Sequence, residues 1–166
     1  ALTLNRPIRL WEAERGHYAP GVDIFGCDGT PSDCVVLGME VIDPTVDLVV
    51  SGINRGPNLG DDLTYSGTVS AAMEGVILGK GAVAVSLNCQ RSEAQNHYET
   101  AAVSALKILD WLGENALSRG TLLNVNVPNL SLETIEGFMV TRKGLRTYEG
   151  KVTEFRNPHG ALSYWI

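Results

Sequence analysis

The sequence has no long apolar run and no surplus of basic residues. No stretch reaches the length of about 18 apolar residues that a membrane-spanning helix needs, and no basic segment followed by an apolar one indicates a signal peptide. The 13 Lys and Arg residues are outnumbered by 19 Asp and Glu residues, which gives a formal net charge of -6. Without a broad basic face, we expect neither a nucleic-acid polymer nor a membrane surface as partner. A small phosphorylated ligand stays possible, because it needs only a few local hydrogen-bond donors.

Cysteine is also scarce, and the three residues present form no recognisable pattern. Cys27 and Cys34 lie seven positions apart and Cys89 lies far downstream, which is unlike the spacing of zinc ligands. An odd number of cysteines also leaves at least one without a disulfide partner. We therefore expect free thiols in the core of a protein from the reducing cytoplasm.

Several familiar catalytic motifs are missing. The sequence contains neither of the two common phosphate-binding loops, G-x-x-x-x-G-K-[ST] and G-x-G-x-x-G, and it lacks the metalloprotease motif H-E-x-x-H. The G-x-S-x-G turn of serine hydrolases is absent as well, which argues against an activated serine nucleophile. His17, His97 and His159 are widely separated in the sequence, and we expect surface or structural roles for them.

The length and composition fit one globular domain. The chain has 166 residues, of which 44% are hydrophobic and 19% are charged, and this suffices to bury a core without disulfides or a structural metal. We expect a single domain over residues 1–166. The sequence starts without Met in an apolar–polar alternation and stops in an apolar run, 164–166. We therefore expect an excerpt of a longer chain, without its first strand and its C-terminal end.

Alternating strand and helix patterns predict an α/β fold. Three short apolar runs, 47–51, 82–87 and 122–127, are typical of strands that are buried on both faces. Apolar residues at helical spacing separate these runs, in one stripe over 69–77 and another over 98–112. This order predicts a Rossmann-like, three-layer fold with a mostly parallel sheet and right-handed crossovers.

Two further elements are expected outside this alternation. Thr30 is a good N-cap and Pro31 a good first residue for a short helix. From Gly137 onward the pattern loosens, and we expect a hairpin or arm over residues 137–166. In open parallel sheets, ligands bind beyond the carboxyl ends of the strands. Candidate chemistry is therefore expected in the loops that follow the three strands.

Residues 51–68 form the one loop that is rich in candidate site residues. A loop this long between a buried strand and a helix is costly to order and is usually functional. Ser66, Gly67 and Thr68 open the next helix, where free backbone N–H groups, the positive end of the helix dipole and two hydroxyls would suit a phosphate. The alternative is that Ser66 or Thr68 only caps the helix.

The same loop holds a candidate metal ligand and a pair of carboxylates. Asn54 lies just past the carboxyl end of the first strand, where its amide oxygen would suit a hard divalent cation. The alternative for Asn54 is a residue that shapes an Asx turn. Asp61 and Asp62 are adjacent and point apart, so we interpret them as solvated loop charges or as charges near a helix N-terminus.

Residues 51–62 (SGINRGPNLGDD), together with 65–68 (YSGT), closely resemble the SurE (stationary-phase survival protein) family of metal-dependent nucleotidases. Further segments are similar to the same family: 2–4 (LTL), 29–34 (GTPSDC), 123–128 (LNVNVP) and 164–166 (YWI). The resemblance covers essentially the whole chain, and the long loop motif is specific. It therefore carries implications for individual residues.

The resemblance implies that Asn54 is a metal ligand and that Asn58, Ser66, Gly67 and Thr68 line a phosphate pocket. Among these, we expect Asn54, Ser66 and Thr68 to take part in catalysis. The other metal ligands of the family are an Asp pair and a Ser, which would lie upstream of this chain. We therefore expect this chain alone to be inactive.

The C-terminal part shows one similarity and one departure. The stretch 142–148 (RKGLRTY) resembles a region of the family that contributes to subunit contacts; the alternative is a solvated basic strand. At position 159 the chain has His where the resemblance leads us to expect Arg. This departure puts in doubt an anion contact from the C-terminal arm.

The resemblance implies a metal-dependent phosphomonoesterase that hydrolyses nucleoside monophosphates, a 5′/3′-nucleotidase with potential exopolyphosphatase activity. It implies one divalent cation such as Mn²⁺ or Mg²⁺, a nucleotide substrate, and a cytoplasmic homodimer or homotetramer. The alternative is a regulatory module that binds a nucleotide or phosphate without turnover. A second alternative is a scaffold in which the glycine-rich loop is a subunit interface.

Overall fold

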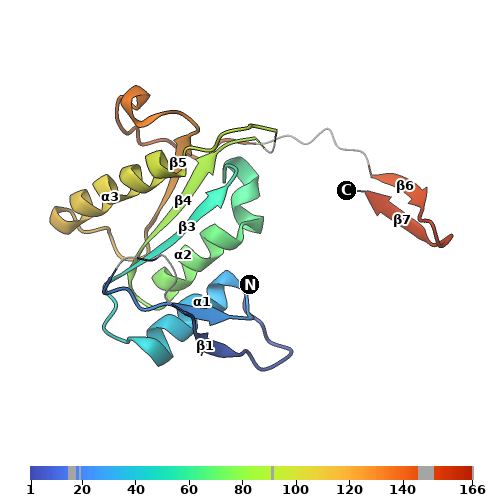
Figure 1. The fold of residues 1–166 in the computed structure, drawn as a ribbon, viewed down its shortest axis with the longest axis horizontal. Helices are drawn as coiled ribbons and strands as arrows, with labels where there is room; N and C mark the ends of the chain where they lie inside the picture. Colours follow the sequence, from blue (N-terminus) through green and yellow to red (C-terminus); the bar gives the residue numbers. More distant parts are fainter. Residues whose placement is uncertain (15–17, 19, 91, 146–151, 166) are drawn as a thin grey trace.

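The computed structural model describes residues 1–14, 18, 20–90, 92–145 and 152–165 (Figure 1). Some residues named above lie outside these ranges, namely His17, Arg146, Thr147, Tyr148 and Ile166. Among the described residues, none of the helices has the length and hydropathy that crossing a membrane would require.

Three parallel strands make the central sheet. They are β3 (Leu48–Arg55), β4 (Gly81–Asn88) and β5 (Leu122–Pro128), and they lie side by side in that order. β4 is the middle strand and the most deeply buried, because helices cover both of its faces. β3 continues past Ser51, its predicted end, so that Asn54 lies within the strand rather than after it.

Helices cover both faces of this sheet. On one face, α2 (Gly67–Ile77) packs against Ala82 and Ala84 of β4, and α1 (Pro31–Leu37) packs beside α2. On the other face, α3 (Tyr98–Glu114) packs against Val83 and Val85. Alternate residues of a strand point to opposite faces, so the fold has three layers, with α2 and α3 on opposite sides (Figure 1). The predicted α/β fold class is confirmed.

The predicted handedness is wrong for one of the two crossovers. The chain advances in one direction across the sheet, from β3 to β4 to β5, while its two connecting helices lie on opposite faces. Two such connections have opposite hands, although right-handed crossovers greatly predominate in proteins. The sequence could not reveal the handedness. β4 is apolar toward both faces, so its residues do not indicate which helix covers which face.

The start of α1 agrees with the sequence prediction, whereas the buried face of α2 agrees only in part. Thr30 caps α1 in a capping box with Asp33, and Pro31 is the first helical residue. In α2 the buried face contains Ala71 and Gly75, whereas Met73 and Ile77 of the predicted stripe are 46% and 69% exposed. The helix is rotated because small residues, rather than the largest apolar ones, let it approach the sheet.

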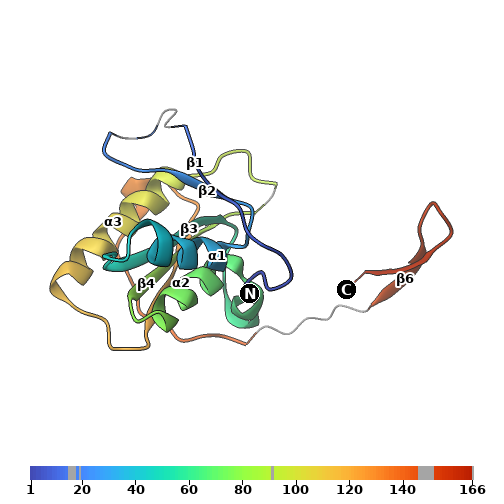
Figure 2. The same cartoon turned by 90° about the horizontal axis from the view of Figure 1, so that it is seen from below.

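Two β-hairpins and three short helical turns complete the part of the fold that the structure describes. β1 (Leu10–Glu12) pairs antiparallel with β2 (Phe25–Cys27), and β6 (Thr153–Arg156) pairs antiparallel with β7 (Leu162–Trp165). The β6–β7 hairpin lies away from the α/β body in both views (Figures 1 and 2). The short turns are η1 (Gly38–Ile42), η2 (Gly60–Tyr65) and η3 (Leu132–Thr134).

The close approach of α2 to the sheet gives a first testable prediction. A Cβ atom at Gly75 would lie 2.7 Å from Cγ2 of Val49 on β3. Overpacking of a core by one methyl group costs about 1–3 kcal/mol. We expect Gly75→Ala to lower the free energy of unfolding by this amount, measured by urea denaturation.

A second helical glycine provides the matched control. Around Gly113 of α3, an added Cβ would meet nothing within 4 Å. Alanine is the better helix former, so Gly113→Ala should leave stability unchanged or raise it by about 0.5 kcal/mol. Equal effects of the two substitutions would contradict the packing assigned to Gly75.

Candidate functional site

Polar residues gather at the carboxyl end of the sheet, on the face that α2 covers. Asn54 of β3 is in register with Ser86 of β4, and Ser86 is in register with Asn126 of β5. These three residues form a row across the sheet, at the edge where α2 begins. Ser86 is fully buried. The structure therefore brings Asn54 to the sheet edge that the sequence pattern indicates.

Asn58 fixes the loop above this row. Its side chain is buried and donates from Nδ2 to Oγ of Ser86 at 2.7 Å. Its backbone N–H donates to Oδ1 of Asn126 at 2.8 Å, and its carbonyl accepts from Nδ2 of Asn124 at 2.9 Å and of Asn126 at 3.1 Å. These contacts tie the loop to β4 and β5. They give Asn58 an anchoring role in addition to the phosphate-lining role expected from the resemblance.

The backbone bends sharply just before Asn54. The register between β3 and β4 shifts between Ser51 and Asn54, and Gly52 has a φ of 133°. A Cβ at Gly52 would lie 2.4 Å from the carbonyl oxygen of Val85. Only glycine fits this approach, and the bend determines the register position at which Asn54 emerges.

Hydrogen bonds from its amide nitrogen hold the Asn54 side chain in place. Its Nδ2 donates to the carbonyl of Gly56 at 2.9 Å and, more weakly, to that of Arg55 at 3.4 Å. Both of these hydrogen bonds use the amide nitrogen rather than the amide oxygen. A neutral oxygen of this kind is a suitable ligand for Mg²⁺ or Mn²⁺.

The start of α2 carries several hydrogen-bond donors. Ser66 is the N-cap, and its Oγ accepts from the backbone N–H of Val69 at 3.2 Å. The N–H groups of Gly67 and Thr68 occupy the first two helical positions, which have no partner within a helix. Together with the dipole of α2 and the hydroxyl of Thr68, they form a compact set of donors. The capping role and the phosphate role proposed for Ser66 are compatible, since a hydroxyl that accepts can also donate.

A second helix begins next to the first. A Cβ at Gly67 would lie 3.4 Å from Cγ of Pro31 at the start of α1. Asp33 of α1 is 3% exposed and accepts from the N–H of Thr3 at 3.0 Å, the hydroxyl of Thr3 at 2.6 Å and the N–H of Thr30 at 2.7 Å. The N-terminal segment is thereby anchored beside the start of α2.

These contacts determine the ionisation of Asp33. Burial desolvates the carboxylate and works to raise its pKa, but the hydrogen bonds from Thr3 and Thr30 outweigh this effect and hold the pKa well below its ordinary value. Asp33 is therefore charged at neutral pH. It stabilises the folded chain only while it is ionised.

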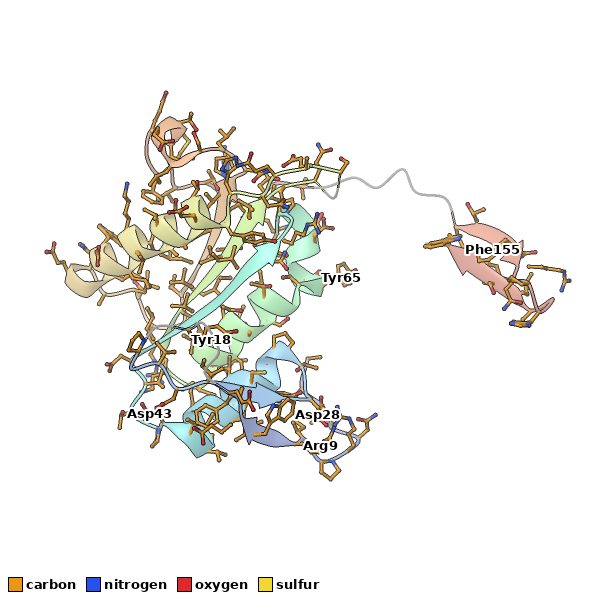
Figure 3. The ribbon with its side chains drawn as sticks, viewed as in Figure 1. Arg9, Tyr18, Asp28, Asp43, Tyr65 and Phe155 are labelled. Carbon is orange, nitrogen blue, oxygen red and sulfur yellow. The ribbon has the colours of Figure 1, made fainter. Side chains whose placement is uncertain are left out.

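Several neighbours of the site were missed by the sequence analysis. Lys143 pairs with Asp61 and so brings the segment after β5 against the glycine-rich loop. Asn129 accepts from the N–H of His97 at 2.8 Å and donates to the carbonyl of Gln95 at 2.8 Å, which joins the loops after β4 and β5. Tyr65, directly before the N-cap of α2, is 87% exposed and projects from the body (Figure 3).

One signal in the sequence could have revealed part of this set. Asn124 and Asn126 alternate with valines in a strand that is otherwise apolar. Alternation of period two places both amides on one face. Asn124 also has a buried Oδ1 without a hydrogen-bond partner among the described residues. Buried polar atoms without a partner are rare, and a bound water, ion or ligand is one explanation for them.

The described residues form no metal site on their own. No cluster of three or more His, Cys, Asp and Glu side chains able to hold an ion occurs among them. What they offer is the amide oxygen of Asn54, whose chemistry fits a hard cation.

Comparison with known proteins agrees with this geometry. The sequence profile of the family described as "Survival protein SurE" matches residues 1–150. The chain belongs to the SurE family. The 5′/3′-nucleotidase SurE of Photorhabdus laumondii is 48% identical over 167 aligned residues, and the 5′-nucleotidase SurE of Pelobacter propionicus is 46% identical.

The fold comparison gives the same result. The crystal structure of the SurE protein from Aquifex aeolicus superimposes with a TM-score of 0.82 at 41% sequence identity, covering 99% of this chain and 64% of that one. The alignments with the Photorhabdus and Pelobacter SurE proteins cover 100% of this chain, but only 61% and 64% of those proteins. The chain thus spans less than two thirds of the length of these SurE relatives.

The thiol prediction is partly wrong. All three cysteines are free and Cys89 is buried, as expected, but Cys34 is exposed and Cys27 is only half-buried. Cys27 is the last residue of β2 and Cys34 lies in the first full turn of α1, and neither is in the core. His97 precedes α3 and His159 lies in the β6–β7 turn, where each uses its backbone N–H in a hydrogen bond to an asparagine.

Asp33 provides a prediction with a defined pH dependence. Its pKa is lowered on folding, so it stabilises the fold above its unfolded-state pKa of about 4, and this contribution is lost as the pH falls below that value. We expect Asp33→Asn to reduce the free energy of unfolding by about 2 kcal/mol at pH 7. The difference from the parent chain should shrink between pH 5 and pH 3, as checked by urea denaturation.

Asp110→Asn, on the exposed side of α3, serves as the control. It removes a charge without removing an anchoring contact, so its stability should follow that of the parent chain at each pH. A constant difference for Asp33→Asn across the same pH range would contradict an ionised anchor.

Proposed function

We propose that this chain contains the phosphate-binding part of a metal-dependent phosphomonoesterase that hydrolyses nucleoside monophosphates, a 5′/3′-nucleotidase. The observation that carries the proposal is the arrangement at the carboxyl end of the sheet. The donors at the start of α2 and Asn54 of β3 lie at the same edge of the sheet, the donors suited to an anion and the amide oxygen of Asn54 to a cation. The names of the SurE relatives support the same reaction.

Each group has a distinct task in this proposal. The backbone N–H groups of Gly67 and Thr68 and the hydroxyls of Ser66 and Thr68 bind the phosphoryl oxygens. Their hydrogen bonds strengthen as negative charge develops on those oxygens in the transition state. Because these donors are fixed by the helix, they need no reorganisation during the reaction.

Asn54 serves the cation. A divalent ion such as Mn²⁺ or Mg²⁺, when bound, polarises a phosphoryl oxygen and provides an acidified water as nucleophile. Asn54 would hold it through Oδ1 while the hydrogen bond from Nδ2 to Gly56 fixes the amide orientation. An Asp pair and a Ser upstream of this chain would complete the ligand set, as in the family.

The neighbouring residues support a nucleotide rather than a bare phosphate. The ring of Tyr65 is 87% exposed next to Ser66, and an exposed aromatic ring is a surface on which a base can stack. Asn58 anchors the loop and keeps these groups in place. Exopolyphosphatase activity is a further proposal, since a chain of phosphates presents the same terminal group to α2.

The assembly and location are part of the same proposal. We propose one domain over residues 1–166, with 137–166 as an arm that contacts other subunits of a cytoplasmic homodimer or homotetramer. β6 and β7 pair with each other rather than with the main sheet. The hairpin exposes apolar residues, including Leu162 and Trp165, and a partner subunit would cover them.

Asn54→Ala in the full-length protein tests the metal role. We expect loss of metal-dependent phosphatase activity by about tenfold or more, together with weaker binding of Mn²⁺ in a calorimetric titration. Asn115→Ala, at the C-terminal end of α3, is the matched control and should leave both quantities unchanged. Near-normal turnover of Asn54→Ala would reject this role.

The full-length parent protein also distinguishes the regulatory alternative. Release of inorganic phosphate from a nucleoside monophosphate in the presence of Mn²⁺ supports the enzyme. Binding of the nucleotide without any release of phosphate would identify a regulatory module instead.

Thr68→Ala tests the phosphate cradle. Loss of one hydroxyl donor should raise KM for a nucleoside monophosphate by about threefold to tenfold. Thr68→Ala is easier to interpret than Ser66→Ala. The latter should raise KM but should also remove the N-cap of α2, which lowers the free energy of unfolding by about 1 kcal/mol. Ser118→Ala, in the loop before β5 at the opposite end of the sheet, should behave like the parent. An unchanged KM for Thr68→Ala would contradict its contact with phosphate.

A further inference from the structure

Two cysteine sulfurs lie together where β2 leads into α1. Cys27 is the last residue of β2, and Cys34 lies in the first full turn of α1, with its backbone N–H donating to the carbonyl of Thr30 at 3.1 Å. The N–H of Gly29 donates to Sγ of Cys27 at 3.1 Å. The Cys27 side chain lies close enough to that of Cys34 to affect its ionisation. The two thiols are therefore neighbours across the turn that joins the two elements.

The turn between them is held in place from outside. Asp28 accepts from the backbone N–H of Arg9 and from its Nε, both at 2.9 Å, and from Nη1 of Arg6 at 3.1 Å. Figure 3 shows Arg9 and Asp28 side by side at the β1–β2 hairpin. On the other side of the turn, the Thr30 capping box fixes the start of α1. The two cysteines thus lie on a frame that is fixed on both sides.

Small oxidants can reach this pair. Cys34 is exposed and Cys27 is half-buried, whereas Cys89 is buried in the core between the sheet and α3. Burial and the neighbouring Cys27 thiol raise the pKa of Cys34, which keeps Cys34 a thiol in the absence of an oxidant. Accessibility therefore separates the pair from the third cysteine.

We propose that Cys27 and Cys34 form a reversible intramolecular disulfide by exchange with a low-molecular-weight disulfide of the glutathione type. The sulfur of one cysteine attacks the glutathione disulfide, its thiol proton goes to water, and one glutathione leaves as thiolate. The second cysteine, losing its proton in turn, then attacks this mixed disulfide and displaces the second glutathione. Two protein thiols are oxidised to one disulfide, and one glutathione disulfide is reduced to two thiols.

The position of the pair couples this bond to the anchoring of the N-terminal segment. Cys34 directly follows Asp33, which binds Thr3, and Pro31 of the same turn abuts Gly67 at the start of α2. A disulfide would join the end of β2 to this turn and so constrain Asp33 and its partners. The significance of this coupling for phosphate binding rests on the proposed function; formation of the bond does not.

The test is a redox titration of the protein with mixtures of reduced and oxidised glutathione. At each point, free thiols are blocked with one alkylating reagent, disulfides are reduced, and the released thiols are labelled with a second. One tryptic peptide, residues 16–55, contains both Cys27 and Cys34. We expect both cysteines to change label together, without glutathione adducts and reversibly with dithiothreitol, while Cys89 keeps the first label.

Glutathione adducts that persist separately on Cys27 and Cys34, or a disulfide that involves Cys89, would overturn the proposal. So would thiols that stay free at the most oxidising mixtures. Cys89→Ser should oxidise like the parent, and Cys34→Ser should accumulate the mixed disulfide at Cys27. Because the assay contains no nucleotide and no metal, its result is independent of the proposed nucleotidase activity.

Hydrogen exchange tests the coupling. The amide of Thr3, which donates to Asp33, should exchange more slowly in the oxidised protein than in the reduced one, and Cys34→Ser should show no such difference. Equal exchange at Thr3 in both redox states would reject the coupling, even where the disulfide forms.

Discussion

The geometry of the site depends on the burial of Asn58. A buried loop has to pair its backbone polar groups, because an unpaired buried group costs about 1–3 kcal/mol. Here the N–H and carbonyl of Asn58 are paired with amides of β5, and its side chain is paired with Ser86 of β4. The loop is thereby fastened to two strands at once. Anchoring of Asn58 in turn restricts where Asn54, before it in the chain, and Ser66, after it, can lie.

The remaining constraint is electrostatic. A chain with a formal net charge of -6 does not attract an anion by its surface charge. Attraction has to be local, and the starts of α1 and α2 lie together, with Gly67 packed against Pro31. One of these helix starts is occupied by the carboxylate of Asp33, while the N–H groups of Gly67 and Thr68 at the other are the proposed binding site for an anion. The carboxylate of Asp33 and the phosphate of the proposed substrate would thus be stabilised in the same way, by backbone N–H groups at the start of a helix.

The sequence predicted the elements better than their arrangement. The apolar runs gave the three strands, and Thr30 and Pro31 marked the start of α1, because these signals are local. The contacts of Asn58 with Asn124 and Asn126 span more than sixty residues of chain and have no local signature. The faces covered by α2 and α3 were not predictable either, since β4 is buried on both sides. Exposure of Met73 and Cys34 likewise follows from how α2 and α1 are rotated, which depends on their partners.

The central claim is that phosphate binds at the start of α2 beside Asn54. It is tested most directly by recording backbone amide NMR spectra of the full-length protein during a titration with inorganic phosphate in the presence of Mg²⁺. The account predicts that the largest saturable shifts occur at the amides of Gly67 and Thr68, with smaller ones around Asn54. Saturable shifts elsewhere, with the amides of Gly67 and Thr68 unchanged, would contradict it.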